Sequence, residues 1–250
     1  MSLMTVQPSI PVSPSRELSF WDPWSGCRIE AHTPAGRPDL WQQYVEGLSD
    51  SYRHYDVEGA LDLDSFVTGE STSIFFVAFS PDEEIVAGVR MHGPLGDKAE
   101  AHAMLEFAAD PAGVATVGRL IDDRLPFGVI EMKGGWVARH SDRRSELGNT
   151  LARCFLHAMT MLDVQFAFGT ASTHAVSRWR TTGARKAEGL SPVAYPDDRY
   201  QTMMMWWDFA KLDERADPAQ MRRFRSEAAA LIRSGIRSDD SVISTRRAHA

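Results

Sequence analysis

The chain contains only two cysteines, Cys27 and Cys154, among its 250 residues. Two thiols are too few for a disulfide framework or for a metal site of their own, and Cys154 lies within an apolar helical pattern that predicts burial. No apolar run approaches the ~18 residues that a membrane-spanning helix needs, and the N-terminus lacks the basic-then-apolar pattern of a secretion signal. We therefore expect a cytoplasmic protein with reduced thiols, no metal and no membrane span.

The chain has no excess of positive charge, since 34 acidic side chains outnumber 27 lysines and arginines. The formal net charge is -7, whereas a nucleic-acid partner requires a dominant basic face. We therefore expect no nucleic-acid partner. The remaining composition, 43% hydrophobic and 24% charged, is that of an ordinary globular protein with a core.

The length suits one domain of roughly 150 to 200 residues with appendages. Residues 1–20 are predicted to be a disordered lead, because they are rich in Pro and Ser and begin with Met-Ser-Leu-Met, a sequence typical of an expression scar. Residues 21–211 form the predicted domain, residues 212–235 a C-terminal helix, and residues 236–250 a disordered tail. The helix either covers the sheet or makes a homodimer contact.

Periodic apolar residues and turn signals predict the secondary structure. We expect strands at 27–32, 73–79, 85–91, 128–137, 166–170 and 200–209. We expect helices at 38–52, 99–109, 145–162 and 174–181, and leave 114–120 open. This order predicts an α/β (α+β) fold, a mixed sheet with helices on both sides.

The segment from residue 130 to residue 151 is the most informative part of the chain. Glycines inside a strand commonly mark a bulge or a close backbone approach, so Gly134-Gly135 predicts a local splay of the sheet. The following turn brings backbone N–H groups, a helix N-terminus, Arg143 and Arg144 to one place, which suits a pyrophosphate. The alternative is an ordinary strand-to-helix turn with solvated arginines.

This turn resembles the acyl-donor-binding motif of the GCN5-related N-acyltransferase (GNAT) superfamily, Arg/Gln-x-x-Gly-x-Gly/Ala. Arg143 matches its first position and Gly148 its last, but Glu146 stands where the middle glycine is usual. The resemblance implies a mostly antiparallel sheet with a central splay. It also implies acyl-CoA, coenzyme A or an acyl carrier protein phosphopantetheine as co-substrate, and acyl transfer to an amine by direct attack. The residues expected to hold this donor are Gly135, Trp136, Val137, Arg139, Arg143, Arg144, Ser145, Gly148 and Asn149.

Further segments resemble one branch of the superfamily, the autoinducer synthases and N-acyl amino acid synthases. They are an acidic stretch at 55–64, the sequence Gly88-Val89-Arg90-Met91, the sequence Met104-Leu105-Glu106-Phe107, and a strand with Glu131 near its start. The resemblance implies a long-chain acyl thioester donor and an N-acyl amino acid or lactone product. Arg90 and Trp179 are the expected acceptor-binding residues.

Glu131 is the expected catalytic residue. A carboxylate in the apolar run Val129 to Met132 is costly to bury unless its pKa rises or it finds a partner. It is interpreted as the general base that takes a proton from the attacking amine; the alternative is an outward-facing or Arg-paired glutamate. Glu146 either repels the anionic donor or simply favours the helix N-terminus through the dipole.

Trp179 departs from the family pattern. The superfamily commonly has a tyrosine four residues before the glycine that Gly183 matches, and the tyrosine hydroxyl protonates the leaving thiolate. An indole cannot do so. His174, Ser177, Tyr195 and solvent remain candidates, and His140 is noted because it lies beside the basic turn.

Two further groups have competing interpretations. The methionines and aromatic residues at 203–207, with Met159, Met161, Phe166 and Phe168, either line an acyl-chain tunnel or form an ordinary core. Acidic residues of the 55–64 stretch either receive an amino group or form a solvated loop.

We therefore expect an N-acyltransferase with a small-molecule amine acceptor. One alternative is a GNAT-like module that binds an acyl thioester without turnover. Another is an α/β domain outside the superfamily.

Overall fold

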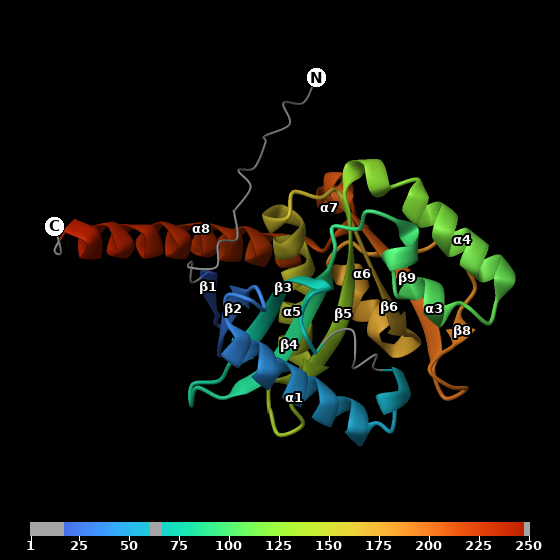
Figure 1. Ribbon diagram of the computed structural model, residues 1–250, viewed down its shortest axis with the longest axis horizontal. Helices are drawn as coiled ribbons and strands as arrows, with labels where there is room; N and C mark the ends of the chain where they lie inside the picture. The colour runs from blue at the N-terminus through green and yellow to red at the C-terminus, as the bar shows by residue number, and fades with distance from the viewer. Residues whose placement is uncertain (1–17, 61–66, 248–250) are drawn as a thin grey trace.

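The sheet at the centre of the molecule is mixed but largely antiparallel. The protein is described by a computed structural model over residues 18–60 and 67–247. Within those ranges one sheet has the strand order β1-β2-β3-β4-β5-β6-β9-β7, with β8 pairing with β9, and of its paired strands only β5 and β6 run parallel (Figure 1). The strands are β1 (Leu18–Asp22), β2 (Cys27–His32), β3 (Thr72–Phe79), β4 (Ile85–His92), β5 (Val129–Val137), β6 (Phe166–Ser172), β7 (Arg185–Lys186), β8 (Val193–Ala194) and β9 (Gln201–Asp208).

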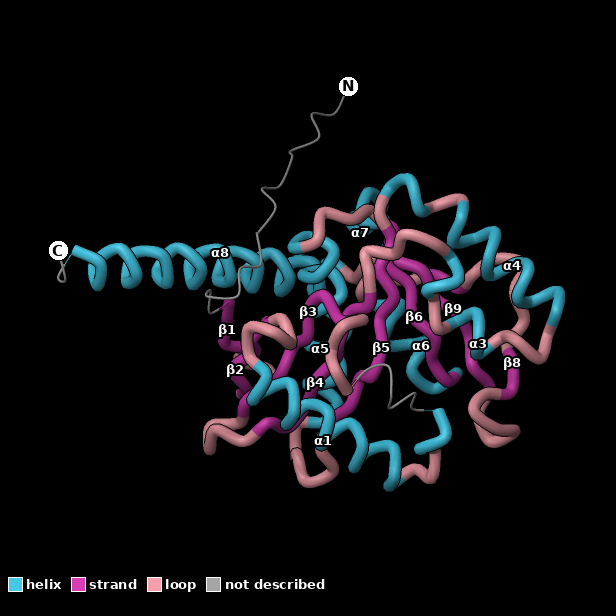
Figure 2. The backbone as a smooth tube through the Cα atoms, in the orientation of Figure 1, coloured by secondary structure: helices cyan, strands magenta, loops and turns pink. Residues whose placement is uncertain are grey.

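Helices cover both faces of this sheet (Figure 2). Helices α1, α3 and α4 pack on one face, whereas α5, α6 and α8 pack on the other, and each face has its own buried apolar clusters. The helices are α1 (Pro38–His54), α3 (Ala103–Glu106), α4 (Pro111–Asp122), α5 (Arg144–Met161), α6 (Val176–Thr181), α7 (Leu212–Arg215) and α8 (Pro218–Arg247). Short 3-10 turns lie at Glu58–Ala60, Lys98–Glu100, Leu125–Phe127, Thr173–Ala175 and Phe209–Lys211.

Most predicted elements are confirmed with closely similar bounds. Helix α1 begins with Pro38 at its first position and buries Leu40, Trp41, Tyr44 and Leu48, the positions that helical spacing selected. The predicted helix at 99–109 is instead the 3-10 turn Lys98–Glu100 followed by α3, because the backbone at Ala101 is extended. The open stretch 114–120 lies within helix α4.

Both ends of the domain differ from the prediction. Residues 18–20, expected in the disordered lead, belong to β1, which pairs with β2 and buries Leu18 and Phe20. Residues 236–247, expected in a disordered tail, continue helix α8 through Gly235. A glycine inside a helix costs only about 1 kcal/mol, so it does not by itself end one. Residues 1–17 and 248–250 lie outside the described residues.

The predicted bulge at the paired glycines is confirmed. Gly88 of β4 pairs with Trp136 and Arg90 with Lys133, so β5 holds one residue more than β4 between these pairs. Gly134 has φ 57°, a left-handed conformation that favours glycine. The Tyr44 hydroxyl of α1 donates a hydrogen bond to the Gly134 carbonyl at 2.7 Å, which ties the bulge to the helix.

The predicted splay is also confirmed. Strands β5 and β6 pair only from Val129 opposite Phe166 to Met132 opposite Gly169. Beyond Met132, β5 pairs with β4 alone, while residues 170–172 of β6 pair with β9. The two central strands therefore part at the position of the bulge.

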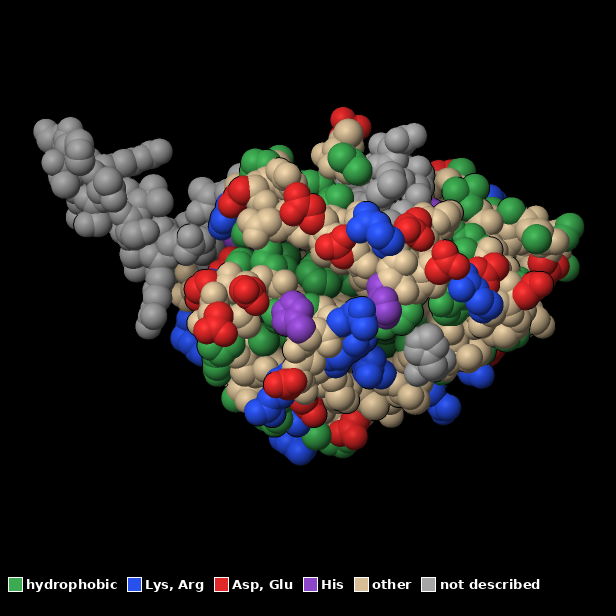
Figure 3. All heavy atoms as spheres, turned by 90° about the horizontal axis from the view of Figure 1, so that it is seen from below, with side chains coloured by type: hydrophobic (Ala, Val, Ile, Leu, Met, Phe, Trp, Pro, Cys, Tyr) green, Lys and Arg blue, Asp and Glu red, His purple; other side chains and the backbone are tan. Residues whose placement is uncertain are grey.

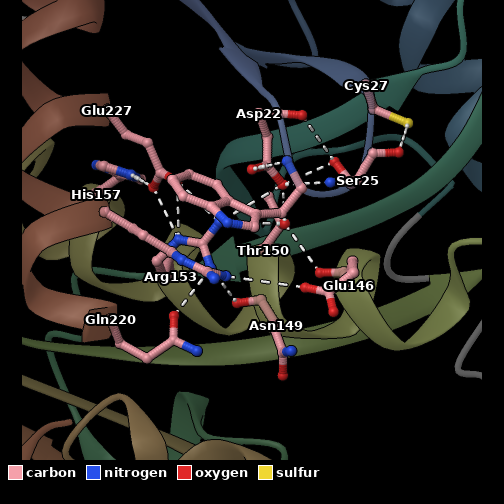
Figure 4. Close-up of polar contacts among 12 residues, drawn as sticks. Asp22, Ser25, Cys27, Glu146, Asn149, Thr150, Arg153, His157, Gln220 and Glu227 are labelled. Carbon is pink, nitrogen blue, oxygen red and sulfur yellow. Dashed lines mark hydrogen bonds and ion pairs between the residues drawn. The ribbon is translucent and has the colours of Figure 1, made fainter.

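A buried polar network holds helix α5 against β1 and α8 (Figure 4). The Arg153 guanidinium is fully buried and donates to Glu227 of α8 at 2.8 Å. Glu227 also contacts His157 at 3.0 Å, while Asp22 of β1 lies 3.6 Å from Arg153 and accepts from the Thr150 hydroxyl. Because buried charges are tolerated only when they are paired, this network fixes the position of α5 relative to the sheet edge.

Replacement of Glu227 with Gln should destabilise the fold. The substitution leaves the buried Arg153 without its main counter-charge, and breaking a buried pair typically costs about 3 kcal/mol or more. Urea denaturation at pH 7 measures the free energy of unfolding. The exposed pair Asp50–Arg53, with side chains 75% and 65% exposed, provides the control: Asp50→Asn should change stability by less than about 0.5 kcal/mol.

Glu227→Gln should also change how the free energy of unfolding depends on pH in the acidic range. Burial raises the pKa of Glu227, but hydrogen bonding to His157 and the charge of Arg153 bring that pKa below its usual value. The folded pKa therefore lies below that of the unfolded chain, so the contribution of Glu227 is present above about pH 4.3 and is lost as the pH falls further. Equal acid sensitivity of Glu227→Gln and wild type would contradict this assignment.

Candidate active site

A cleft opens where β5 and β6 part. It has a volume of about 780 Å³ and passes between residues 132–137 of β5 and residues 170–172 of β6. Half of the backbone N–H and C=O groups of an internal strand face each neighbour, so in this stretch those on the β6 side face the cleft. Gly135, Trp136 and Val137, three of the expected donor-binding residues, line it.

The N-terminus of α5 forms one end of the cleft. Arg144, Ser145 and Gly148, three of the expected donor contacts, line this end. Arg144 also contacts the Tyr55 hydroxyl at 3.1 Å. The positive end of the helix dipole and the free N–H groups of the first turn make such a helix N-terminus favourable for a phosphate group.

Arg178 of α6 is a second cation at this end, and the sequence did not single it out. Its guanidinium lies over Gly148, where a Cβ atom would come within 2.7 Å of Nη1. The glycine therefore leaves room for the guanidinium against the first turns of α5. The spacing of residues 143–148 does not predict this contact, because the contact depends on how α6 packs on α5.

Other expected donor contacts lie outside the cleft lining. Arg139, Arg143 and Asn149 do not border it, and Arg143 is exposed at the N-cap of α5. Glu146 does not border the cleft either; its carboxylate lies 3.8 Å from Arg223 of α8. The carboxylate that stands in place of the motif glycine thus lies outside the cleft lining, near Arg223.

Glu131 lies outside the cleft as well. Its side chain is fully buried, and its two oxygens accept hydrogen bonds from the backbone N–H groups of His102 and Ala103 at 2.8 Å and 3.0 Å. Burial raises its pKa, with Glu106 adding to the effect. Both carboxylate oxygens of Glu131 are therefore engaged by backbone N–H groups at the start of α3, which is a structural role.

Glu106 and Lys133 form an ion pair that does border the cleft. The Lys133 ammonium lies 2.9 Å from Oε1 of Glu106. The sequence shows Lys133 two residues after Glu131, so the two share a face of β5. The sequence therefore predicts that Glu131 and Lys133 share a face of β5, but it does not predict that α3 packs against that face.

Trp179 lines the cleft and packs edge-on against Phe155, with ring centroids 5.6 Å apart. Of the candidate proton donors, Tyr195 borders the cleft and contacts His102 at 3.3 Å. Ser177 does not border it, and the side chain of His174 lies outside the described part of the chain.

Several remaining candidates are engaged elsewhere. Arg90 does not border the cleft and donates to the Thr72 hydroxyl at 3.0 Å. Asp56 lies 3.4 Å from Arg199. His140 is 70% exposed. Asp62 and Asp64 lie outside the described residues.

The methionine-rich strand belongs to the core. Met203, Met204, Met205, Trp206 and Trp207 are buried in two apolar clusters, and none of them borders the cleft. The same is true of Met159, Met161 and Phe168, whereas Phe166 is partly buried, packs against one of these clusters and also does not border the cleft. Besides Trp136, Val137 and Trp179, the apolar lining includes Val89, Met132, Leu151, Ala152 and Phe155 of β4, β5 and α5.

The described residues contain no group of three His, Cys, Asp or Glu side chains able to hold a metal ion. Over the same residues, no helix combines the length and apolar character needed to cross a bilayer. Both cysteines are free and buried. On the face seen in Figure 3, acidic and basic side chains are interspersed, and no single basic patch dominates it.

We compared the chain with known proteins. No protein-family model matches it. Proteins of Mycobacterium tuberculosis and Mycobacterium bovis, described as uncharacterized, are 39% identical to it over 236 residues, which cover 92% of this chain and 89% of theirs.

Among solved structures, the chain is similar to FeeM, an N-acyl amino acid synthase from uncultured soil microbes, with a TM-score of 0.54, 11% identity and coverage of 78% of this chain and 97% of FeeM. It is also similar to BjaI, a CoA-dependent acyl-homoserine lactone synthase solved with SAM and isopentyl-CoA, with a TM-score of 0.53, 14% identity and coverage of 84% and 100%.

At these identities the structural likeness establishes the fold, and both neighbours are GNAT-type proteins. The predicted resemblance is therefore confirmed at the level of the fold. The chain belongs to the family of these mycobacterial proteins, and its fold is that of the GCN5-related N-acyltransferase superfamily.

Proposed function

We propose that this protein is an N-acyltransferase that moves an acyl group from a thioester of coenzyme A, or of acyl carrier protein phosphopantetheine, to a small-molecule amine. The amine attacks directly, without a covalent acyl-enzyme. The observation that carries the proposal is the parting of β5 and β6 beside Gly134-Gly135, which opens a cleft leading to the N-terminus of α5. The fold shared with FeeM and BjaI supports the same reaction class.

The donor phosphates bind at the α5 end of the cleft. The first-turn N–H groups and the helix dipole favour an anion there, and the guanidinium groups of Arg144 and Arg178 add planar charged donors suited to phosphate oxygens. Arg139, Arg143 and Asn149 flank this site and contact the parts of the donor that extend beyond the cleft.

The thioester carbonyl lies against β5. Backbone N–H groups of residues 133–137 that face the cleft have no strand partner on that side, and such preorganised donors stabilise the oxyanion of a tetrahedral intermediate. Val89, Met132, Leu151 and Phe155 offer an apolar path for the acyl chain.

Trp179 does not prevent this chemistry. A thiol has a pKa near 8.5, so a thiolate is a moderately stable leaving group that can take its proton from solvent. The indole fills the wall of the cleft against Phe155. An acidic hydroxyl at this position is therefore dispensable for product release.

Loss of the Arg178 guanidinium should weaken donor binding. Arg178→Ala should raise the Kd for coenzyme A by about tenfold or more, since hydrogen bonds to charged groups contribute about 1.5–3 kcal/mol and 1.4 kcal/mol is tenfold. Isothermal titration calorimetry gives the Kd. Gly148→Ala should act in the same direction, because its Cβ displaces the guanidinium. Arg180→Ala, an exposed arginine on the same helix, is the matched control, and an equal effect in that variant would count against the phosphate site.

Turnover separates an enzyme from a binding module. With octanoyl-CoA and a panel of amino acids and alkyl amines, the wild-type protein should release free thiol only when a suitable amine is present, and mass spectrometry should show the amine gaining the acyl mass. Native mass spectrometry should in addition show coenzyme A bound to the purified protein. Binding of octanoyl-CoA without thiol release across the panel would favour the alternative, a GNAT-like module that holds an acyl thioester without turnover.

A further inference from the structure

Glu106 is a buried carboxylate that borders the cleft. It lies at the end of α3, its residue is 6% exposed, and it borders the cleft at the point where β5 and β6 part. Oε1 accepts from the Lys133 ammonium at 2.9 Å, whereas Oε2 makes no hydrogen bond of good geometry among the described residues; the Thr170 hydroxyl lies beside the carboxylate. Because a buried charged oxygen without a good hydrogen bond is costly, its presence points to a bound group that completes it.

Its surroundings keep this carboxylate ionised. Burial raises the pKa of Glu106, but the charge of Lys133, the neighbouring Thr170 hydroxyl and the charge of His102 together lower that pKa below its usual value. Nε2 of His102 lies 3.6 Å from Oε1. An ionised carboxylate can accept a proton, whereas a neutral one cannot.

Glu106 and the phosphate site lie on opposite faces of the sheet. Arg144 and Arg178 belong to α5 and α6 on one face, whereas Glu106 and Lys133 lie with α1 and α3 on the other. A donor that enters along α5 and passes between β5 and β6 presents its thioester to the α1/α3 face. An amine that approaches from that face meets Glu106.

Glu131 has no free oxygen that an amine in the cleft could reach. Its oxygens are both engaged by the backbone of the first turn of α3, and it lies outside the cleft lining. Its bonds to His102 and Ala103 instead hold the helix that carries Glu106.

We propose that Glu106 is the catalytic residue that takes the proton from the attacking amine, and that Lys133 is the residue that positions its carboxylate. The inference deepens the proposed function and rests on it. The amine nitrogen forms a bond to the thioester carbon, and the C–S bond breaks with its electron pair leaving on sulfur. The N–H proton passes to Oε2 of Glu106 and then to solvent, and the thiolate takes a proton from solvent.

Replacement of Glu106 with Gln should separate binding from turnover. With octanoyl-CoA and the amine that the wild type acylates, kcat should fall by about 100-fold to 10,000-fold, the usual contribution of a positioned general base. The Kd for coenzyme A should stay close to wild type. The melting temperature should fall, because Lys133 loses its ion-pair partner, so kcat is measured at a temperature where both proteins are fully folded. Glu100→Gln, a nearby carboxylate that accepts from Gly96 N–H outside the cleft, is the matched control and should retain full kcat.

The pH profile supplies a readout that a structural role would not change. Wild-type kcat should fall in acid as Glu106 is protonated, and Glu106→Gln should lack this limb. Lys133→Met should move the limb to higher pH, because loss of the ammonium raises the Glu106 pKa. The other groups facing Glu106 are His102 of α3, Tyr52 of α1 and Glu131 of β5, and none of them is altered in these variants.

The outcomes distinguish this inference from the proposed function. Wild-type kcat in Glu106→Gln, or a loss of kcat in Glu131→Gln that leaves Glu106→Gln active, overturns the role of Glu106 alone. A loss of coenzyme A affinity in folded Glu106→Gln that matches the loss of kcat also overturns it, since that pattern indicates a residue that maintains the cleft rather than one that takes a proton. Absence of thiol release from the wild type with every amine overturns the proposed function and this inference together.

Discussion

The extra residue in β5 at Gly134-Gly135 is the constraint on which the site depends. It shifts the register against β4 by one position, and the Tyr44 hydroxyl holds the Gly134 carbonyl on the α1 side. Gly134 can take this conformation because it has no Cβ, and one placed there would come within 2.5 Å of the Tyr44 oxygen. A strand bent at this point cannot continue beside β6, so the sheet opens where the backbone of β5 is still held rigidly on its other edge.

This opening divides the charges of the site between two faces. The guanidinium groups of Arg144 and Arg178 lie with α5 and α6, and the Glu106 carboxylate lies with α3. In the proposed reaction, this arrangement attracts an anionic donor to one end and keeps it from the carboxylate at the other. The arrangement depends on α5 keeping its place, which the buried pair of Arg153 and Glu227 secures from the far side of the helix.

The sequence predicted the fold well because its signals are local. The helical spacing in α1, the β3–β4 hairpin and the paired glycines of β5 each specify a conformation within a few neighbouring residues, and the structure confirms them. β1 was missed because its apolar residues Leu18 and Phe20 follow a Pro/Ser-rich stretch and are buried only by packing against other elements.

The site was harder to predict because its residues meet across long sequence separations. Gly135, Trp136, Val137, Arg144, Ser145 and Gly148, expected as donor contacts from the family resemblance, and Trp179, expected as an acceptor contact, do line the cleft. Glu106 and Lys133 lie 27 residues apart in sequence and meet only because α3 packs on β5. Glu131 was singled out because it is a carboxylate in an apolar strand. That pattern marks a buried acid, but it cannot distinguish an acid that serves chemistry from one that anchors a helix.

The departures from the family motif show which of its features the geometry needs. Glu146 replaces a glycine, yet its carboxylate lies 3.8 Å from Arg223 and outside the cleft, so its charge does not occupy the proposed donor site. Gly148 is retained, and the structure gives a reason, because the Arg178 guanidinium occupies the space that a side chain would fill. If donor phosphates bind here as proposed, the turn needs an open helix N-terminus with cations beside it. Side chains at the other positions can vary as long as they leave that surface clear.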